Sequence, residues 1–371
     1  MDKVYDKCCG IDVHKKLIVA CFRKGSKQEL RNFGATTREL LELANWLQNG
    51  GCEMVAMEST ASYWKPLYNI LESSELKAMV VNASHMKAVP GRKTDTKDAE
   101  WIAELLQHGL LKASYIPDKQ QRELRELVRY RKSLVSERTR ELNRLQKMLE
   151  GANIKLSGTV SDINCMSARN ILEYLLTGEF FDEAKYDEMY KQKIIAHNLK
   201  ASKEQIIDDL NGVMTPLQRR MMKELLSHLD ELNVHINNLE DEIDNFMKPE
   251  EKKATQAIQD VTGIGKNSSQ AIISVIGTDM SRFPTAGHLA AWAGLCPGNN
   301  ESAQKRKTGK MRKGNALLRS TLVVCAHSAT RNKNSYFYAQ FMRISSHRGK
   351  KRAYVAVAHS MLIAIYHILK D

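Results

Sequence analysis

The segment YDKCCGIDVHKKLIVACF, residues 5–22, decides the fold of the first part of the chain. It contains two apolar runs, 5–13 and 16–22, on either side of a short polar turn, which is typical of two paired strands. Residues 29–33 are suited to a third strand. We therefore expect the chain to begin with a three-stranded meander.

Helix and strand patterns alternate after this meander. The expected elements are a helix over 37–48, a strand over 53–57, a helix over 63–71, a strand over 77–81 and a helix over 98–111. Three strands followed by alternating helices and strands is the order of an α/β domain.

Four carboxylates stand at the ends of these elements. Asp12 lies near the end of the first strand, Glu58 follows the 53–57 strand, and Asp95 and Asp98 are spaced i and i+3 at a helix start, where they share one face. Any one of them alone is adequately explained as a cap or a surface acid. Together they suit Mg²⁺, or Mn²⁺ in its place, because hard cations prefer oxygen ligands. Two such ions about 4 Å apart stabilise both the attacking and the leaving oxygen of a phosphodiester reaction.

The middle of the chain is helical. Residues 120–149 are almost free of Gly and Pro, and apolar residues over 222–246 recur at alternating steps of three and four, as in a coiled-coil seam. The seam consists of Met222, Leu225, Leu229, Leu232, Ile236, Leu239, Ile243 and Phe246. It can pack against the 120–149 helix of its own chain or pair two chains, and we expect a role in dimerisation. Residues 151–217 are interpreted as short helices.

The last third of the chain is strongly basic. Between Glu301 and Ala353 there are fourteen Lys or Arg and one acid, whereas the whole chain has a net charge of +13. Such a stretch attracts nucleic-acid backbones by counterion release, and the alternative is a solvated lysine-rich surface. Upstream, Gly263 and Gly265 permit a helix–hairpin–helix turn whose following helix start could hold a phosphate.

Composition excludes several classes of protein. The seven cysteines are odd in number and contain no C-x-x-C pair, which argues against a disulfide framework and a zinc site. The N-terminus has no apolar core of a signal peptide, and no unbroken apolar run approaches the roughly 20 residues of a membrane span. We expect a cytoplasmic protein that makes no contact with a membrane.

At the N-terminal acids the sequence resembles a known family. GIDVHK at 10–15, MESTASY at 57–63 and KTDTKDA at 93–99 are similar to the DEDD motifs of the insertion-sequence 110 family of bacterial transposases, which includes the Piv-type DNA invertases. The resemblance implies an RNase H-like, RuvC-like domain that binds Mg²⁺ through Asp12, Glu58, Asp95 and Asp98.

The resemblance extends to the C-terminal part. VTGIG at 261–265, FPTAGHLAAWAGLCP at 283–297 and RKGNALLR at 312–319 are similar to that family's second, mainly helical domain. In the family a nucleophilic serine follows the G-L-x-P turn, and the matching position is Ser302. Alanine stands at 303, where the family usually has glycine. Basic residues that flank this serine are expected to contact nucleic acid, namely Lys305, Arg306, Lys307, Lys310, Arg312 and Lys313.

The resemblance also implies an architecture and partners. It places a RuvC-like domain over 1–118, a coiled-coil region over 119–250 and a transposase domain over 251–371. It implies donor and target DNA, a structured guide RNA encoded by the element, a dimer or tetramer, and a nucleoid-associated bacterial protein. Ser302 would attack DNA and form a phosphoserine intermediate.

Three alternatives remain at the sequence level. One is a metal-dependent nuclease or resolvase that uses water as nucleophile. Another is a site-specific invertase, and the last is an inert nucleic-acid-binding protein that keeps the acids for folding. His14, beside the acids, is either a DNA contact or an ordinary surface histidine.

Overall fold

The computed structural model describes most of the chain and divides it into two compact units. The described residues are 3–82, 98–160, 162–195, 201–297, 301, 302, 305, 306, 311 and 314–370. The units span 1–117 and 118–371, and each is described by itself.

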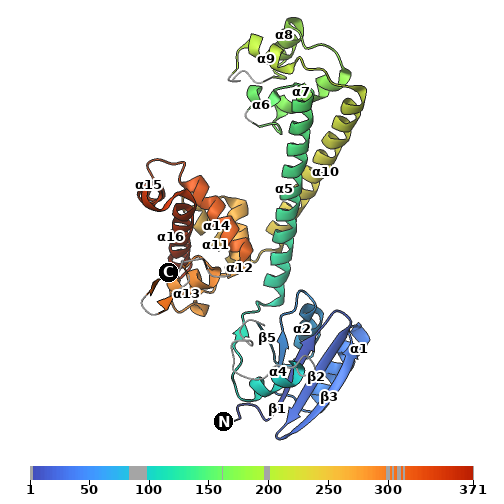
Figure 1. Ribbon diagram of the computed structural model, residues 1–371, viewed down its shortest axis with the longest axis vertical. Coiled ribbons are helices and arrows are strands. Elements are labelled where there is room, and N and C mark those ends of the chain that lie inside the picture. The colour runs from blue at the N-terminus through green and yellow to red at the C-terminus, as the bar shows by residue number, and fades with distance from the viewer. Residues whose placement is uncertain are drawn as a thin grey trace. The chain divides into compact units, whose positions relative to one another are not determined.

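The N-terminal unit is built on a mixed sheet (Figure 1). Its strands are β1 (Lys7–Val13), β2 (Leu17–Lys24), β3 (Lys27–Gly34), β4 (Met54–Glu58), β5 (Ala78–Val81) and β6 (Ala113–Ser114). They lie in the order β3-β2-β1-β4-β5-β6. The meander β1-β2-β3 is antiparallel, β4 and β5 run parallel to β1, and β6 is antiparallel to β5. The expected meander and α/β order are confirmed, and the short β6 was not expected.

Helices cover both faces of this sheet because its central strands are apolar on both sides. Helices α1 (Thr37–Asn49) and α2 (Trp64–Ser73) bury leucines against the face that carries Cys9, Ile11 and Val55. Helix α4 (Asp98–Gln107) packs on the opposite face. Each fully buried leucine contributes about 1.5–3 kcal/mol relative to an exposed one. The unit therefore has three layers, with α4 alone among the described helices on its side.

Gly10 lets α4 approach β1 very closely. A Cβ atom at position 10 would lie 2.2 Å from the backbone nitrogen of Ala103 and 2.5 Å from the carbonyl oxygen of Ala99. At the far end of α4, the backbone nitrogen of Val4 donates to the carbonyl oxygen of Gln107 at 2.8 Å. Helix α4 thus runs antiparallel to β1, and its first turn lies toward the carboxyl end of that strand.

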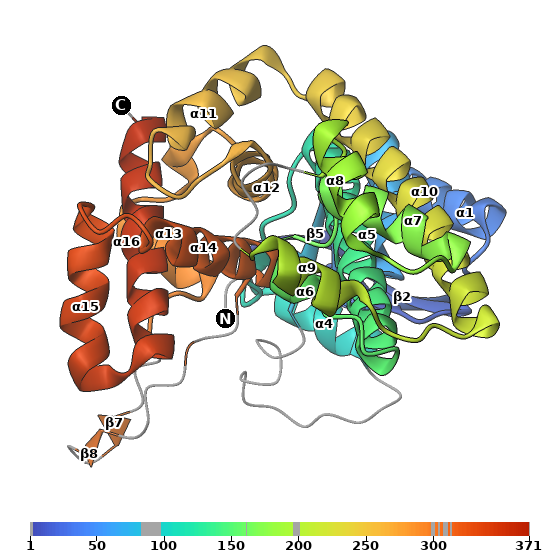
Figure 2. The same cartoon turned by 90° about the horizontal axis from the view of Figure 1, so that it is seen from above.

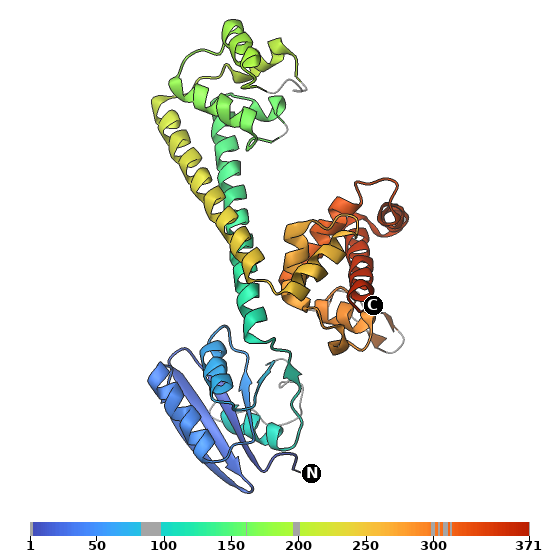
Figure 3. The same ribbon diagram turned by 180° about the vertical axis from the view of Figure 1, so that it is seen from behind.

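The second unit begins with two long helices that form a hairpin (Figure 3). They are α5 (Lys119–Gly151) and α10 (Pro216–Phe246). The buried residues of α10 are Met222, Leu226, Leu229, Leu232, Ile236, Leu239 and Ile243. This is the expected seam with two differences: Leu226 is buried in place of Leu225, and Phe246 is only partly buried. Its residues share cores with Leu134 and Leu145 of α5, so of the two pairings left open the structure shows the one within the chain. Dimerisation stays a prediction.

The described residues between the long helices form four short helices, as expected for 151–217. They are α6 (Leu156–Thr159), α7 (Met166–Thr177), α8 (Glu183–Lys191) and α9 (Lys203–Leu210). They enclose a separate hydrophobic core around Ile171, Leu172 and Phe181, together with the adjoining ends of α5 and α10.

The C-terminal helices pack around one further core. They are α11 (Pro249–Gln259), α12 (Lys266–Ile276), the 3-10 turn η1 (Met280–Arg282), α13 (Ala286–Ala293), α14 (Ala316–Ala329), α15 (Tyr336–Arg348) and α16 (Lys350–Lys370). Leu124 and Val128 of α5 and Ile243 of α10 belong to the same core. The middle and C-terminal regions are therefore joined by apolar packing, and the division at residue 250 stays a prediction.

Two arginines of α5 reinforce this junction. The Arg125 side chain donates to the carbonyl oxygens of Ser274 and Val275, at the end of α12, where a cation also meets the negative end of the helix dipole. Arg131 is buried and donates to Gln270 at 2.6 Å and to the carbonyl oxygen of Asn267 at 3.0 Å. Burial lowers the pKa of Arg131, so these hydrogen bonds compensate for lost hydration.

One described helix, α16, is long and apolar enough on average to cross a membrane by length and composition alone. This differs from the expectation that no such segment exists, because small and aliphatic residues outweigh the interspersed polar ones. Core helices of soluble proteins pass the same test. Ala353, Val357, Met361 and Ile365 of α16 are buried in the C-terminal core.

Replacing Gly10 with alanine should destabilise the N-terminal unit. The added Cβ would overlap the backbone of α4, and overpacking of this kind costs about 1–3 kcal/mol. Urea unfolding followed by tryptophan fluorescence measures it, because Trp46, Trp64 and Trp101 lie in this unit. The matched control is Gly151→Ala, where a Cβ meets nothing within 4 Å. We expect that change to be neutral or to stabilise by up to about 1 kcal/mol. An unchanged midpoint for Gly10→Ala would contradict the close approach.

Candidate active site

Asp12 and Glu58 lie side by side at one edge of the sheet. The parallel register pairs Gly10 with Ala56 and Ile11 with Met57, so the next residues along the two strands are Asp12 and Glu58. Alternation along each strand places both on the face that α4 covers. The two strands end at the same edge, which brings the two carboxylates together.

Asp98 approaches the same edge from above. It is the first residue of α4, next to Ala99, whose carbonyl oxygen abuts Gly10. Since α4 runs antiparallel to β1, Asp98 lies toward the strand end that carries Asp12. Three of the four predicted acids are therefore directed to one end of the sheet by β1, β4 and α4.

Asp12 is nearly buried, with 8% of its surface exposed. Its Oδ2 atom lies 2.9 Å from Nε2 of His14, whose side chain is 59% exposed. The two residues stand on either side of Val13, where β1 ends. His14 is thus hydrogen-bonded to Asp12. Its interpretation as an ordinary surface histidine missed this contact.

The described residues contain no group of three or more His, Cys, Asp or Glu side chains close enough to hold a metal ion. Asp95 lies outside the described residues. The oxygen donors are of the kind that Mg²⁺ requires, and their common edge suits an ion-binding site. The four-carboxylate metal site accordingly stays a prediction.

Ser302 lies on a two-stranded hairpin in the second unit (Figure 2). Strand β7 (Glu301–Ser302) pairs antiparallel with β8 (Lys305–Arg306), so that Ser302 is opposite Lys305. The backbone of these four residues is described, and their side chains are not. Lys307, Lys310, Arg312 and Lys313 lie outside the described residues.

The base of this hairpin is held in two ways. Pro297 and Met311 form an antiparallel bridge. Gly314 then presses against the end of α13, because a Cβ there would lie 2.4 Å from the carbonyl carbon of Ala293. The next residue, Asn315, caps α14 by accepting from the backbone nitrogen of Leu318 at 3.1 Å. The described residues on both sides of the Ser302 segment are therefore held in place by backbone contacts.

Two helices flank Gly263 and Gly265, as the predicted helix–hairpin–helix turn requires. Helices α11 and α12 are joined by residues 260–265, in which Gly263 has a φ of +92° and Gly265 caps the start of α12. Gly263 also abuts the backbone of Cys325 and Ala329 in α14, so part of its role is packing. The long helix α10 ends at Phe246, and Pro249 occupies the first turn of α11.

Comparison with known families assigns both halves of this arrangement. Residues 9–154 match a family model of DEDD transposases of the IS110 type, described as "Transposase", and residues 255–341 match the "Transposase IS116/IS110/IS902 family". The chain belongs to the IS110 family of transposases. Members of this family are enzymes that cut and rejoin DNA.

Three curated proteins are similar to this IS110-family transposase. The transposase for insertion sequence element IS1111A of Coxiella burnetii is 23% identical over 86% of this chain and 78% of its own length. A probable family 20 transposase of Pseudomonas aeruginosa is 23% identical over 87% and 80%. The pilin gene-inverting protein of Moraxella lacunata is 22% identical over 100% and 97%. The family resemblance inferred from the motifs is confirmed.

Three cysteines in the N-terminal unit of the transposase are poorly suited to catalysis. All seven are free. Burial raises the pKa of Cys8 and that of Cys21 to about 11 and that of Cys52 to about 12. A thiol with such a pKa remains protonated near neutral pH and is a poor nucleophile.

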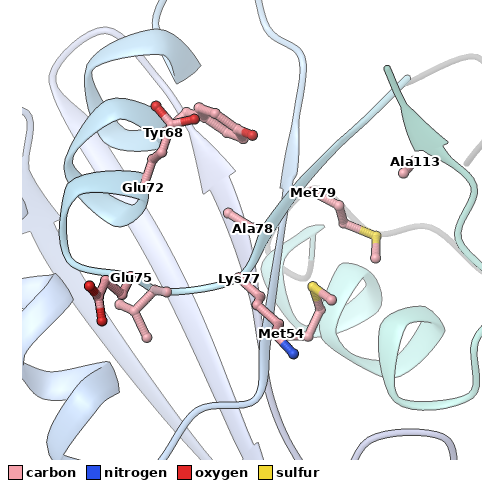
Figure 4. Close-up of a pocket in the computed structure, with 9 residues that line it drawn as sticks. Met54, Tyr68, Glu72, Glu75, Lys77, Ala78, Met79 and Ala113 are labelled. Carbon is pink, nitrogen blue, oxygen red and sulfur yellow. The ribbon is translucent and has the colours of Figure 1, made fainter. Parts of the chain in front are cut away.

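The transposase also has a hollow of about 490 Å³ at the opposite edge of the sheet (Figure 4). Met54 and Ala78, the first residues of β4 and β5, line it together with Tyr68 and Glu72 of α2. Ligands of open α/β sheets bind outside the carboxyl ends of the strands, where Asp12 and Glu58 lie. This hollow is therefore separate from the candidate active site.

Sequence reasoning missed the structural role of two glycines in the transposase. Gly10 and Gly314 each give one element room to touch the backbone of another. The signal for Gly10 was a glycine inside an apolar strand, which often marks a close backbone approach. For Gly314 it was a glycine directly before a helix-capping asparagine.

Gly314→Ala should impair the transposase more than it destabilises it. The added Cβ would push the base of the Ser302 hairpin away from α13, which misplaces the serine while the core remains packed. We expect the rate of strand exchange on DNA to fall at least tenfold. The free energy of unfolding of the second unit, measured with urea, should fall by less than about 3 kcal/mol. Gly151→Ala again serves as control. Full exchange activity in Gly314→Ala would show that this contact does not position the hairpin.

Proposed function

We propose that this transposase is an RNA-guided DNA recombinase whose active site combines the N-terminal acids with Ser302. The observation that carries the proposal is that β1, β4 and α4 direct Asp12, Glu58 and Asp98 to the same end of the sheet, in a chain whose basic half carries the serine. The strand order and the position of α4 support an RNase H-like, RuvC-like fold for the N-terminal unit.

Asp12, Glu58, Asp95 and Asp98 would hold Mg²⁺, or Mn²⁺ in its place. A bound divalent ion supplies positive charge that stabilises a pentavalent phosphate and favours a deprotonated hydroxyl. Within the chain, the Asp12 carboxylate accepts a hydrogen bond from Nε2 of His14, which limits the rotation of this carboxylate. The sheet and α4 keep the acids in place before DNA arrives, which reduces the cost of ordering them.

Ser302 would act as the nucleophile. Its Oγ atom attacks a DNA phosphorus, the Oγ–P bond forms, and the P–O bond to one sugar breaks. The serine proton leaves to a base, and the departing sugar oxygen takes up a proton to become a hydroxyl. A hydroxyl end of the partner strand then reverses the reaction at the same phosphorus and releases Ser302, so the number of phosphodiester bonds is conserved.

The proposed assembly is a dimer or tetramer of the chain. It binds donor and target DNA and the element's structured guide RNA. The concentration of positive charge between Glu301 and Ala353 supports a nucleic-acid partner. Lys305, Arg306, Lys307, Lys310, Arg312 and Lys313 would contact phosphates beside Ser302. The proposed location is the cytoplasm, at the nucleoid.

A second candidate function is site-specific inversion. It is favoured by the similarity to the pilin gene-inverting protein over the whole chain. Inversion and transposition share the same strand chemistry and differ in how the DNA sites are arranged, so the site residues above serve both.

Ser302→Ala should abolish the covalent complex with DNA. The wild-type chain, incubated with Mg²⁺, the element's RNA and labelled DNA, should give a protein–DNA adduct that survives denaturation. The alanine variant lacks the attacking oxygen and should give none. The control is Ser346→Ala, an exposed serine of α15 in the same unit, which should give the wild-type yield. Cleavage at the wild-type rate by Ser302→Ala would establish water as the nucleophile.

Removing single acids should weaken metal binding. Asp12→Asn, Glu58→Gln and Asp98→Asn each replace a charged ligand by a neutral one, and calorimetry should find Mg²⁺ bound about tenfold or more weakly. Glu104→Gln is the matched control, since Glu104 lies on α4 but pairs with Arg23 at 3.7 Å. Wild-type Mg²⁺ affinity in all three variants would contradict the metal site. Full exchange activity in them would favour an inert, folding role for the acids.

A further inference from the structure

The C-terminal helices contain a cavity of about 510 Å³ at the base of the Ser302 hairpin. Its lining residues come from three places: the hairpin base, α15 and one stripe of α16. They are Leu295, Pro297, Met311, Gln340, Lys351, Arg352, Val355, Ala356, His359 and Ser360. Pockets of roughly 300–1,000 Å³ are of the size that encloses a small ligand.

The stripe of α16 changes its chemistry in steps of one helical turn. It begins with the exposed cations Lys351 and Arg352 in the first turn, continues with Val355 and Ala356, and ends with the neutral polar pair His359 and Ser360. Ten residues of helix span about 13 Å. One wall of the cavity therefore runs from positive charge, through an apolar section, to hydrogen-bonding groups.

The polar end of the cavity has unused hydrogen-bonding capacity. Nε2 of Gln340 donates to Oγ of Ser360 at 2.8 Å, whereas Oε1 of Gln340 is buried and has no partner among the described residues. Burial lowers the pKa of His359, so its ring is neutral near pH 7 and offers one donor and one acceptor. Such groups suit the edge of a nucleobase.

We propose that this cavity takes one unstacked nucleotide of the DNA strand that Ser302 attacks. Its phosphate lies at Lys351 and Arg352, its base packs against Val355 and Ala356, and the base edge meets His359 and Ser360. The apolar wall formed by Pro297 and Met311 packs against the other side of the base. Enzymes that act on DNA often remove a nucleotide from the stack in this manner.

The position of the cavity beside the Ser302 hairpin favours DNA over the guide RNA as its occupant. Pro297 and Met311 form both the cavity wall and the bridge that closes the hairpin, and Ser302 is five residues from Pro297. Five extended residues reach at most about 17 Å. A nucleotide in the cavity is therefore within a short distance along the strand from the attacked phosphate. This inference rests on the proposed function, since it assigns the cavity to the strand at Ser302.

The experiment places 2-aminopurine, one position at a time, along DNA of the element's own junction. Its fluorescence rises when the base leaves the stack. The full chain with its RNA should give a several-fold rise at one position near the joint, in the wild type and equally in Ser302→Ala. Ala356→Trp fills the cavity and should remove the rise, whereas Ala339→Trp, the same change at an exposed α15 position outside the cavity, should retain it.

A second pair of variants tests the cavity with milder changes, in case Ala356→Trp misfolds. Lys351→Gln should lower the rise at saturating DNA, and Lys350→Gln, its exposed neighbour outside the cavity, should weaken DNA binding without changing the rise. No rise at any DNA position, an equal rise in Ala356→Trp, or a rise only when the probe is in the RNA would overturn the assignment. Failure of the Ser302 mechanism gives a different result: the wild type would form no covalent adduct with DNA, while the 2-aminopurine fluorescence would still rise in the wild type and in Ser302→Ala.

Discussion

The arrangement of the candidate active site depends on the contact between α4 and β1 at Gly10. Because position 10 has no side chain, the backbone of α4 lies directly on the strand at Ala99 and Ala103. This contact sets the height of α4 above the sheet. It thereby determines where Asp98 lies relative to Asp12, two residues beyond Gly10. A larger residue would lift the helix and separate carboxylates that the register of β1 and β4 brings to one edge.

A similar backbone contact lies beside the proposed nucleophile, Ser302. Gly314 touches the end of α13, and the bridge between Pro297 and Met311 closes the loop that carries Ser302. Backbone-to-backbone contacts are less adaptable than contacts between flexible side chains, so they hold a loop base in one place. Pro297 and Met311 both form this bridge and line the cavity, so the proposed nucleotide site adjoins the proposed nucleophile.

Much of this could be predicted from the sequence. The succession of strands and helices along the N-terminal unit followed from apolar periodicity, and the acids were found because they stand at the ends of strands and at the start of a helix. The seam of α10 was found from its spacing, but spacing cannot say which surface a seam covers, and here α5 covers it. The α16 cavity could not be predicted, since Gln340 and His359 meet Pro297 only through tertiary packing. Ser302 was singled out by resemblance, because a serine in a polar loop has no distinctive pattern of its own.

The central claim is that the acids and the serine act on one phosphate. The most direct measurement is mass spectrometry of the peptide that contains Ser302 after reaction with DNA in Mg²⁺, for the wild type and for Asp12→Asn. The account predicts a DNA-linked Ser302 peptide in the wild type and its loss in Asp12→Asn, although that variant folds and binds DNA. A Ser302 adduct formed at the wild-type rate without Asp12 would contradict the account.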